Sequence, residues 1–376
     1  MKNCFRFFLI LCTLVSFSCT KKHRENEILI GVVGSLTGAD ASFGVSMKEG
    51  ILLALEQINE KGGVKGKVFR AKIVDDQSKS EEAASAVSKL IAEDSVLAIL
   101  GEVASSRSLA MAPIAQSNKV PMITPASINP RVTQVGDYVF RVCFVDSFES
   151  YVGAVFARKT LHAKKAAILR DVKTDYSVGL ADAFKENFVK QGGEIVADLA
   201  YSSGDVDFNS QLVTIKNKDP DVIFLPGYYT DVGLIARQRK ALQIRAPLLG
   251  TDGWDSEKLI AIGGDALNGS YFSNFFTADP NNPKNVAFQK DYKEKFKKEP
   301  DGNAFLGYDA MMLLANALER GNEISRVELK RALAETKGFA GITGTITMNE
   351  NRDAIKPAAV IEIRDQAYRL KEVIKP

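Results

Sequence analysis

The feature that most constrains the fold is a regular alternation of short apolar runs with amphipathic stretches. Residues 28–36 form a nearly continuous apolar run, which is typical of a strand buried in a parallel sheet. Apolar residues then recur three or four positions apart between residues 47 and 58, which is the spacing of one helix face. Two glycines at 62–63 mark the end of that helix.

The same alternation continues along the chain, restarts near residue 166, and predicts two α/β lobes with parallel sheets covered by helices on both faces. No linker rich in proline or serine separates the lobes, so several short crossings between them are expected. We assign 28–145 plus 275–350 to lobe 1 and 146–274 plus 351–376 to lobe 2. The remaining predicted strands lie at 68–74, 96–100, 121–124, 166–169, 195–199, 221–226, 247–250 and 271–276, the later helices at 105–116, 284–297 and 304–320, and a β-hairpin at 356–373.

Length and composition agree with this division and exclude several classes of protein. The 376 residues exceed one ordinary domain and suit two. Apolar residues make up 45% and charged residues 25%, with a net charge of +3, which gives no general attraction to nucleic acid. No apolar run reaches the 18 residues of a membrane span. Four cysteines and two histidines leave little material for a zinc site.

The N-terminus predicts export from the cytoplasm. Lys2 and Arg6 precede or begin an apolar stretch that ends near residue 15, the organisation of a secretory signal peptide. We assign residues 1–18 to the signal peptide and the charged residues 19–27 to a tether. Loss of the two basic residues would lower the net charge of the mature chain from +3 to +1.

Cys19 stands at the predicted cleavage site. Signal peptides that end at a cysteine resemble those of bacterial lipoproteins, in which that cysteine is lipidated and becomes the first mature residue. Ser18 fits the small-residue requirement, whereas Ser16 and Phe17 depart from the usual pattern, so an ordinary cut nearby is the alternative. Cys143 would then be the one unlipidated cysteine, and we interpret it as a small buried residue.

Motifs of catalysis are missing from the sequence. It contains no G-x-S-x-G, no H-E-x-x-H and no paired C-x-x-C. The glycine-rich segment 62–67 has the wrong spacing for a phosphate loop. A histidine acting as a catalytic base would have to be His162. Asp75 and Asp76 are adjacent in the sequence, and we interpret them as helix-capping or solvent-facing groups and not as a catalytic carboxylate pair. The sequence therefore predicts neither an enzyme nor a bound cofactor or metal.

Several segments together resemble one family, the type I periplasmic binding proteins of the leucine/isoleucine/valine-binding kind. This resemblance covers nearly the whole mature chain, from residue 28 to about 357. It implies two Rossmann-like lobes joined by three crossings, a ligand cleft between them, and delivery of the ligand to an ABC-type transporter. The segments are IGVVGSLTG at 30–38, FGVSMKEG at 43–50, INEKGGVKG at 58–66, VDDQ at 74–77, GEVASS at 101–106, TPASINPRVT at 124–133, DYSVGLADAF at 175–184, PGYYTDVG at 226–233, LLGTDGWDS at 248–256 and LGYDAMMLLANAL at 306–318.

A candidate anion site lies in lobe 1. Ser105 follows a predicted strand and opens a helix, where free N–H groups and the helix dipole favour an anion; an ordinary N-cap serine is the alternative. By resemblance Ser105 matches the family's carboxylate-binding serine, and Ala126 and Ile128 match the loop that completes the grip. Ile128 replaces the usual threonine and so lacks its hydroxyl. Phe43 matches an aromatic residue of the cleft.

A candidate cation site lies in lobe 2. Asp252 follows a predicted strand within an Asp-Gly turn, so a structural turn is the alternative. By resemblance it matches the acid that pairs with a ligand's α-ammonium group. Tyr176 and Tyr229 match aromatic positions of the cleft wall, Tyr228 beside the latter is a neighbouring candidate, and weaker apolar candidates are Trp254 and Phe305.

These residues lead to a binding protein as the main hypothesis. This protein is expected to be an extracytoplasmic monomer, either lipid-anchored or periplasmic. It would bind an aliphatic, branched-chain amino acid and deliver it to an ABC permease. A sensor of the same fold, with an amide, urea or aromatic acid as ligand and a signalling partner, is the alternative. An extracytoplasmic hydrolase is disfavoured because a nucleophile with its base is missing.

Overall fold

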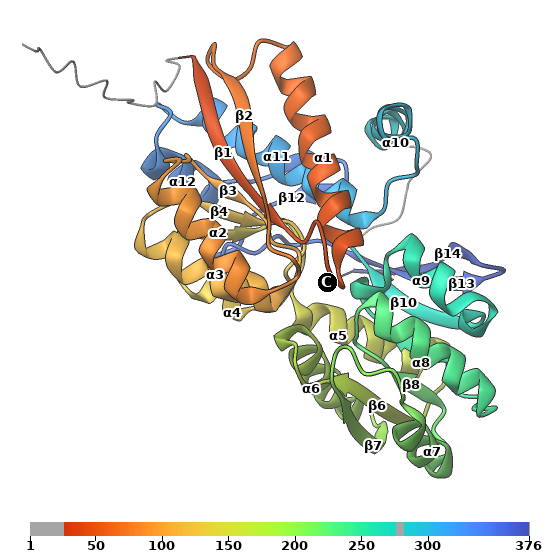
Figure 1. Ribbon diagram of the computed structural model, residues 1–376. Coiled ribbons are helices and arrows are strands. Elements are labelled where there is room, and N and C mark those ends of the chain that lie inside the picture. Colours follow the sequence, from red (N-terminus) through yellow and green to blue (C-terminus); the bar gives the residue numbers. More distant parts are fainter. Residues whose placement is uncertain (1–25, 276–281, 376) are drawn as a thin grey trace, which may run out of the picture.

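Two α/β lobes make up the protein in the computed structural model, which describes residues 26–275 and 282–375 (Figure 1). The sheet of lobe 1 has five strands in the order β2-β1-β3-β4-β5, and all neighbours are parallel. Its strands are β1 (Glu27–Gly34), β2 (Val68–Asp75), β3 (Ile99–Leu100), β4 (Met122–Thr124) and β5 (Val139–Arg141).

The sheet of lobe 2 repeats this strand order. Its strands run β14-β13-β10-β9-β8-β6-β7, and the five from β10 to β7 are parallel. The hairpin of β13 and β14 adds to its edge in antiparallel fashion, as the sequence predicts. The bounds are β6 (Lys165–Asp171), β7 (Glu194–Tyr201), β8 (Val222–Phe224), β9 (Leu248–Gly250), β10 (Ser270–Asn274), β13 (Ala358–Arg364) and β14 (Ala367–Ile374).

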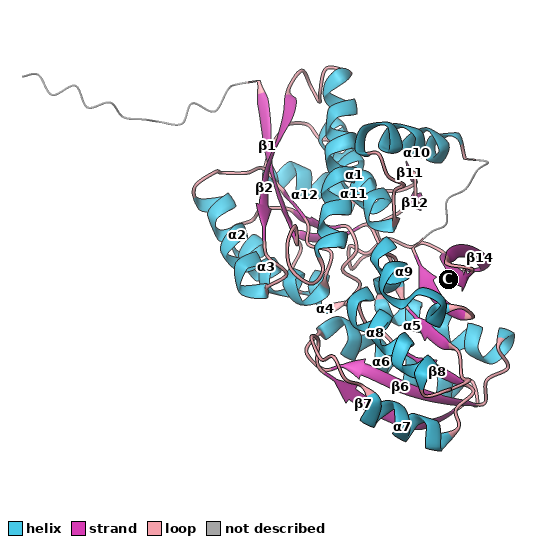
Figure 2. Ribbon diagram, turned by 45° about the vertical axis from the view of Figure 1, so that its right-hand side comes forward, coloured by secondary structure: helices cyan, strands magenta, loops and turns pink. Residues whose placement is uncertain are grey.

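Helices cover both faces of each sheet (Figure 2). Lobe 1 carries α1 (Ala41–Glu60), α2 (Ser80–Ala92), α3 (Ser105–Ser117), α4 (Arg131–Gln134), α10 (Pro283–Phe296), α11 (Gly302–Arg320), α12 (Arg326–Ala334) and the small hairpin β11 (Phe339–Gly341)–β12 (Gly344–Ile346). Lobe 2 carries α5 (Asp146–Val155) with a π-helical turn (Phe156–Thr160), α6 (Asp175–Lys190), α7 (Asn209–Lys218), α8 (Tyr229–Ala241), α9 (Glu257–Gly263) and 3-10 turns at Asp252–Trp254 and Gly264–Leu267.

The close packing of α1 on α11 depends on glycine. A Cβ atom added at Gly50 would lie 1.9 Å from the Ala304 carbonyl oxygen, and one at Gly307 would lie 2.4 Å from the Met47 carbonyl oxygen. Neither contact is compatible with a side chain, so these two residues let the backbones of the helices approach each other. This packing joins the N-terminal part of lobe 1 to a helix about 260 residues later in the chain.

The fold class predicted from the sequence is confirmed, including three crossings of the chain between the lobes. The periodicity missed short elements, namely β5, α5, α12 and the β11–β12 hairpin. Cys143 is fully buried just after β5, and burial raises the pKa of its thiol to about 12. The predicted signal peptide, Cys19 and nearly all of the tether lie outside the described residues. Within the described ranges no helix has the length and apolarity needed to cross a bilayer.

Candidate functional site

The carboxyl ends of the parallel strands of both sheets point to the boundary between the lobes. Ligands of open α/β sheets bind at such ends. Five of the predicted site residues lie in segments that follow a strand. Phe43 follows β1, Ser105 follows β3, Tyr176 follows β6, Tyr229 follows β8 and Asp252 follows β9. The shared strand order therefore brings these five of the seven predicted residues to the same boundary, although they are spread over some 200 positions of the sequence.

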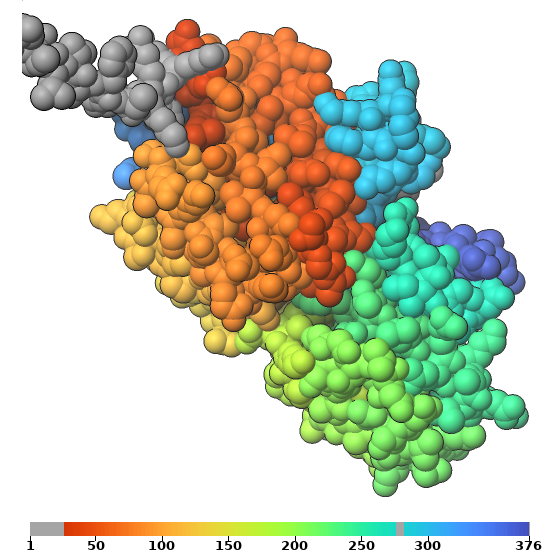
Figure 3. Space-filling view, viewed as in Figure 1, coloured from red at the N-terminus to blue at the C-terminus, as the bar shows by residue number. Residues whose placement is uncertain are grey.

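The two lobes touch directly in this structure. The Tyr229 hydroxyl donates a hydrogen bond of 2.8 Å to the Ala39 carbonyl oxygen, and the hydroxyls of Ser42 and Ser256 lie 2.8 Å apart. Elsewhere along the boundary the Asp175 N–H donates to the Ser106 hydroxyl, and Arg131 pairs with the Asp175 carboxylate. The lobes form one continuous surface in the space-filling view (Figure 3). The arrangement is that of a closed cleft.

A small cavity remains inside the closed cleft. It encloses about 10 Å³, roughly the space for one water molecule. A ligand of amino-acid size can thus enter only when the lobes or the lining side chains move apart. The lining residues are Phe43, Val103, Tyr176, Tyr228, Asp252, Gly253 and Asn303.

Asp252 is held in the wall of this cavity by a fixed set of hydrogen bonds. Its side chain accepts a hydrogen bond of 2.8 Å from the Tyr176 hydroxyl, which also lies 2.7 Å from the Thr251 hydroxyl and accepts one from the Gly253 N–H. The Asp252 N–H donates to Glu149 Oε1 at 2.9 Å. Because Gly253 lacks a side chain, the turn can pass close to the Tyr176 hydroxyl and to the ring of Tyr228.

The electrostatics of Asp252 are those of a buried acid that lacks a cation. Burial raises the pKa of Asp252 to about 7, and burial together with the Asp252 carboxylate raises the pKa of Glu149 well above its usual range. Neither acid forms an ion pair within the described residues. A carboxylate removed from water is stabilised by a positive partner, so a bound ammonium group would complete this site.

Aromatic rings form the apolar part of the cleft wall. Tyr176 and Tyr228 stack with ring centroids 4.8 Å apart. Phe43, from the other lobe, meets Tyr228 edge-on at 5.6 Å and Tyr229 at 4.9 Å. Such contacts favour close packing of the lobes. Phe43, Tyr176 and Tyr228 line the cavity, whereas the predicted Tyr229 does not.

The predicted anion site of lobe 1 lies deeper than the cavity lining. Ser105 is fully buried at the start of α3, and its hydroxyl accepts a hydrogen bond of 3.2 Å from the Asn129 N–H. Ala126 and Ile128 are also buried, and none of the three lines the cavity in the closed arrangement. Arg107 in the first turn of α3 forms buried ion pairs with the carboxylates of Glu102 and Asp40, not with Asp252.

The two weaker candidates belong to the lobe interiors. Trp254 is fully buried and donates from Nε1 to the Leu225 carbonyl oxygen, and its ring lies where a side chain at Gly250 would stand. Phe305 is buried against Phe288, with ring centroids 4.4 Å apart. Neither contributes to the cavity.

Sequence reasoning missed Glu149, Val103, Gly253 and Asn303. Glu149 lies on α5, a helix that the periodicity did not reveal, and a charged residue there carried no signal of burial. Gly253 was seen only as part of a turn, and Asn303 follows the Asp301 cap of α11. Among the described residues, no group of three or more histidine, cysteine or acidic side chains is arranged to hold a metal ion.

The two lobes have the same sheet topology and close on a small cavity. Its wall is aromatic and holds an acid, Asp252, that has no cationic partner among the described residues. These features define a bilobal solute-binding protein. The comparison with known families agrees: a model described as "Periplasmic binding protein" matches residues 27–367. The chain belongs to the periplasmic binding protein family, whose members bind solutes and are not enzymes.

Three relatives illustrate the similarity. The Leu/Ile/Val-binding protein homolog 3 of Brucella melitensis is 32% identical over 339 residues, which cover 88% of this chain and 90% of the relative. A leucine binding protein from Thermotoga maritima has a TM-score of 0.89 and 41% identity, and the match covers 93% and 99% of the two chains. The branched-chain amino acid transporter substrate binding protein of Streptococcus pneumoniae, solved with isoleucine, has a TM-score of 0.88 and 32% identity over 93% and 100%.

Proposed function

We propose that the protein binds a zwitterionic amino acid with an aliphatic, branched side chain and delivers it to the permease of an ABC importer. The observation that carries the proposal is the buried Asp252 carboxylate, which lines the cleft cavity and forms no ion pair within the described residues. An α-ammonium group is the cation of matching size and charge. The relatives named for leucine, isoleucine and valine support this choice of ligand.

In the proposed complex the ligand spans both lobes. Its ammonium group pairs with Asp252, and its carboxylate accepts hydrogen bonds at the N-terminus of α3 from Ser105 and from the backbone of the loop that holds Ala126 and Ile128. The positive end of the helix dipole favours that position for an anion. Its side chain packs against the aromatic rings of Phe43, Tyr176, Tyr228 and Tyr229.

A thermal-shift screen of the purified mature protein over the 20 amino acids tests the ligand class. A ligand that binds only the folded state raises the melting temperature by mass action, so leucine, isoleucine or valine should give the largest shift. Titration calorimetry should then give one site per chain, and sedimentation should show a monomer. If the screen instead finds a shift only with amides, urea or aromatic acids, the sensor hypothesis replaces this one.

We also propose that the protein works at the outer face of the cytoplasmic membrane, in the periplasm or cell envelope, anchored by lipid on Cys19. The charged segment 19–27 would then separate the folded lobes from the bilayer. Labelling of cells with a fatty-acid probe tests this, because Cys19→Ala should abolish incorporation while Cys143→Ala should leave it unchanged. Equal labelling of Cys19→Ala and the unaltered protein would exclude the anchor.

A further inference from the structure

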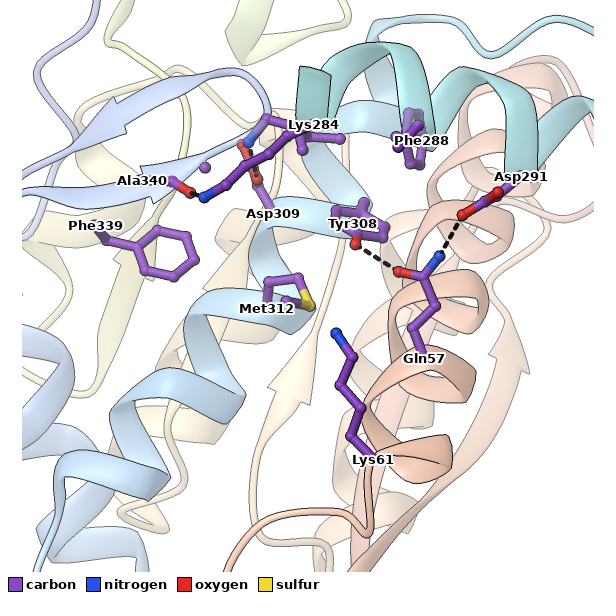
Figure 4. A pocket seen from close by; sticks show the side chains of 13 residues that line it. Gln57, Lys61, Lys284, Phe288, Asp291, Tyr308, Asp309, Met312, Phe339 and Ala340 are labelled. Carbon is purple, nitrogen blue, oxygen red and sulfur yellow. Dashed lines mark hydrogen bonds between the residues drawn. The ribbon is translucent and has the colours of Figure 1, made fainter. Parts of the chain in front are cut away.

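A second cavity lies within lobe 1, away from the boundary between the lobes. It has a volume of about 380 Å³, within the range of small-molecule sites, and shares no lining residue with the cleft cavity. The cavity lies between α1, α10, α11 and the β11–β12 hairpin (Figure 4). It is partly open to solvent.

The floor and one wall of this cavity are apolar. Phe288 from α10 and Tyr308 from α11 contact each other with ring centroids 4.9 Å apart, and Met312 and Phe339 continue the apolar surface. Tyr308, Met312 and Phe339 are only half-buried because they face the empty space. An apolar body would remove this surface from water, which favours binding.

Most polar groups of the lining already have partners. The Tyr308 hydroxyl donates to Gln57 Oε1 at 2.6 Å, and Gln57 Nε2 donates to Asp291 Oδ2 at 2.9 Å. The Asp309 carboxylate accepts from the N–H groups of Ile342 and Thr343 at 2.8 and 2.9 Å. These hydrogen bonds hold the side chains of the wall in place, and they already occupy most of the polar groups that a ligand could otherwise contact.

Two ammonium groups differ from the rest of the lining. Lys284 donates one hydrogen bond of 3.1 Å, to the Ala340 carbonyl oxygen, and an ammonium group has three donors. Lys61, just beyond α1, makes no side-chain hydrogen bond or ion pair with the described chain, and its nitrogen lies below Tyr308 and Met312 in Figure 4. The cavity lining also carries the carboxylates of Asp291 and Asp309, whose charge disfavours a ligand with more than one negative charge.

We propose that this cavity is a second binding site, for a small monocarboxylate with an aromatic or branched apolar body. The apolar body occupies the space between Phe288, Tyr308 and Phe339. The carboxylate lies toward the solvent side and pairs with Lys61. The site is independent of the cleft, so its occupancy does not require the amino-acid function proposed above.

Phenylacetate is a suitable probe, with 2-phenylethanol as its uncharged counterpart. Binding to the mature protein is measured by titration calorimetry and NMR in saturating L-leucine, so that the cleft is occupied. We expect saturable binding of phenylacetate and at least severalfold weaker binding of the alcohol. Absence of saturable binding in the unaltered protein overturns the proposal.

Variants assign the binding to the cavity. Lys61→Gln should weaken phenylacetate roughly fivefold, the scale of an exposed ion pair, whereas Lys89→Gln, an exposed lysine on α2 of the same lobe, should have no effect. Met312→Trp should fill the cavity and abolish binding. Ala287→Phe gives a second filled variant in case the first fails to fold, because Ala287 on α10 lines the cavity and is exposed. Binding of unaltered strength in a folded, filled variant overturns the assignment.

Discussion

At the scale of single residues, the pairing of Asp252 with a ligand ammonium group has a measurable consequence. Asp252→Ala should weaken leucine binding by about 2–5 kcal/mol, the range for removing one member of a buried charge pair. Titration calorimetry with leucine and with 4-methylpentanoate, which lacks the ammonium group, separates the effects. The variant should lose affinity for leucine and much less for the acid; an equal loss for both would argue for a structural role of Asp252.

The raised pKa of Asp252 predicts that leucine binding depends on pH. Burial in the closed cleft raises the pKa of Asp252 to about 7, so the carboxyl is increasingly protonated below that pH. The ligand ammonium favours the carboxylate and lowers the pKa, so binding releases a proton. Affinity should fall by about tenfold per pH unit below 7 and level off above it. Calorimetry in buffers of different ionisation enthalpy measures the released proton, and a flat profile between pH 5 and 7 would contradict the assignment.

The sequence identified part of this site because several of its residues lie in motifs. Asp252, Tyr176 and Phe43 come from segments that resemble the family, and all three line the cavity. Glu149 has no such segment, and its importance comes only from its distance to the Asp252 backbone. Trp254 lies two residues from Asp252, which made it a candidate for the cleft wall. Because Gly250 has no side chain, the Trp254 ring packs against it in the lobe interior instead.

At the scale of elements, the contact between α1 and α11 should be sensitive to a single methyl group. Gly50→Ala places its Cβ against the Ala304 carbonyl oxygen, so the helices must separate, and we expect a loss of about 1–3 kcal/mol of stability. Urea unfolding measures the change. Gly153→Ala on α5 is the matched control, because its nearest neighbour would lie at 3.5 Å, and it should unfold at an unchanged or slightly higher concentration of urea.

Long elements were predictable from periodicity, whereas short ones were not. α1 and α11 each show a repeated apolar face over 20 and 19 residues. β5, β11 and β12 have three residues each, too few to display a pattern. Their place is fixed by neighbouring strands, as when β5 aligns with β4 along the edge of the sheet.

At the scale of the whole molecule, we predict that ligand binding closes the lobes by a hinge. A ligand that contacts both lobes binds the closed state more tightly and shifts the population toward it. With lobe 1 as 28–145 plus 275–350, the crossings near residues 145, 275 and 351 should absorb the backbone change. Small-angle scattering should show a smaller radius of gyration with saturating leucine than without it.

A variant links that motion to one contact. Tyr229→Phe removes the hydroxyl that donates to the Ala39 carbonyl oxygen across the cleft but keeps the ring beside Phe43. The closed state should be less populated at a given leucine concentration, and the scattering transition should move to higher concentration. An identical profile with confirmed binding would indicate a cleft that is already closed before the ligand arrives.

The packing of α1 against α11 also determines when, during synthesis, the chain can complete its fold. Lobe 1 stays incomplete until residues 302–320 have been synthesised, and lobe 2 lacks its edge strands until residue 374. Contacts between such distant parts of a chain form slowly. For a precursor that we propose to be exported, this delay keeps the polypeptide unfolded during synthesis, in the state that a narrow translocation channel can accept.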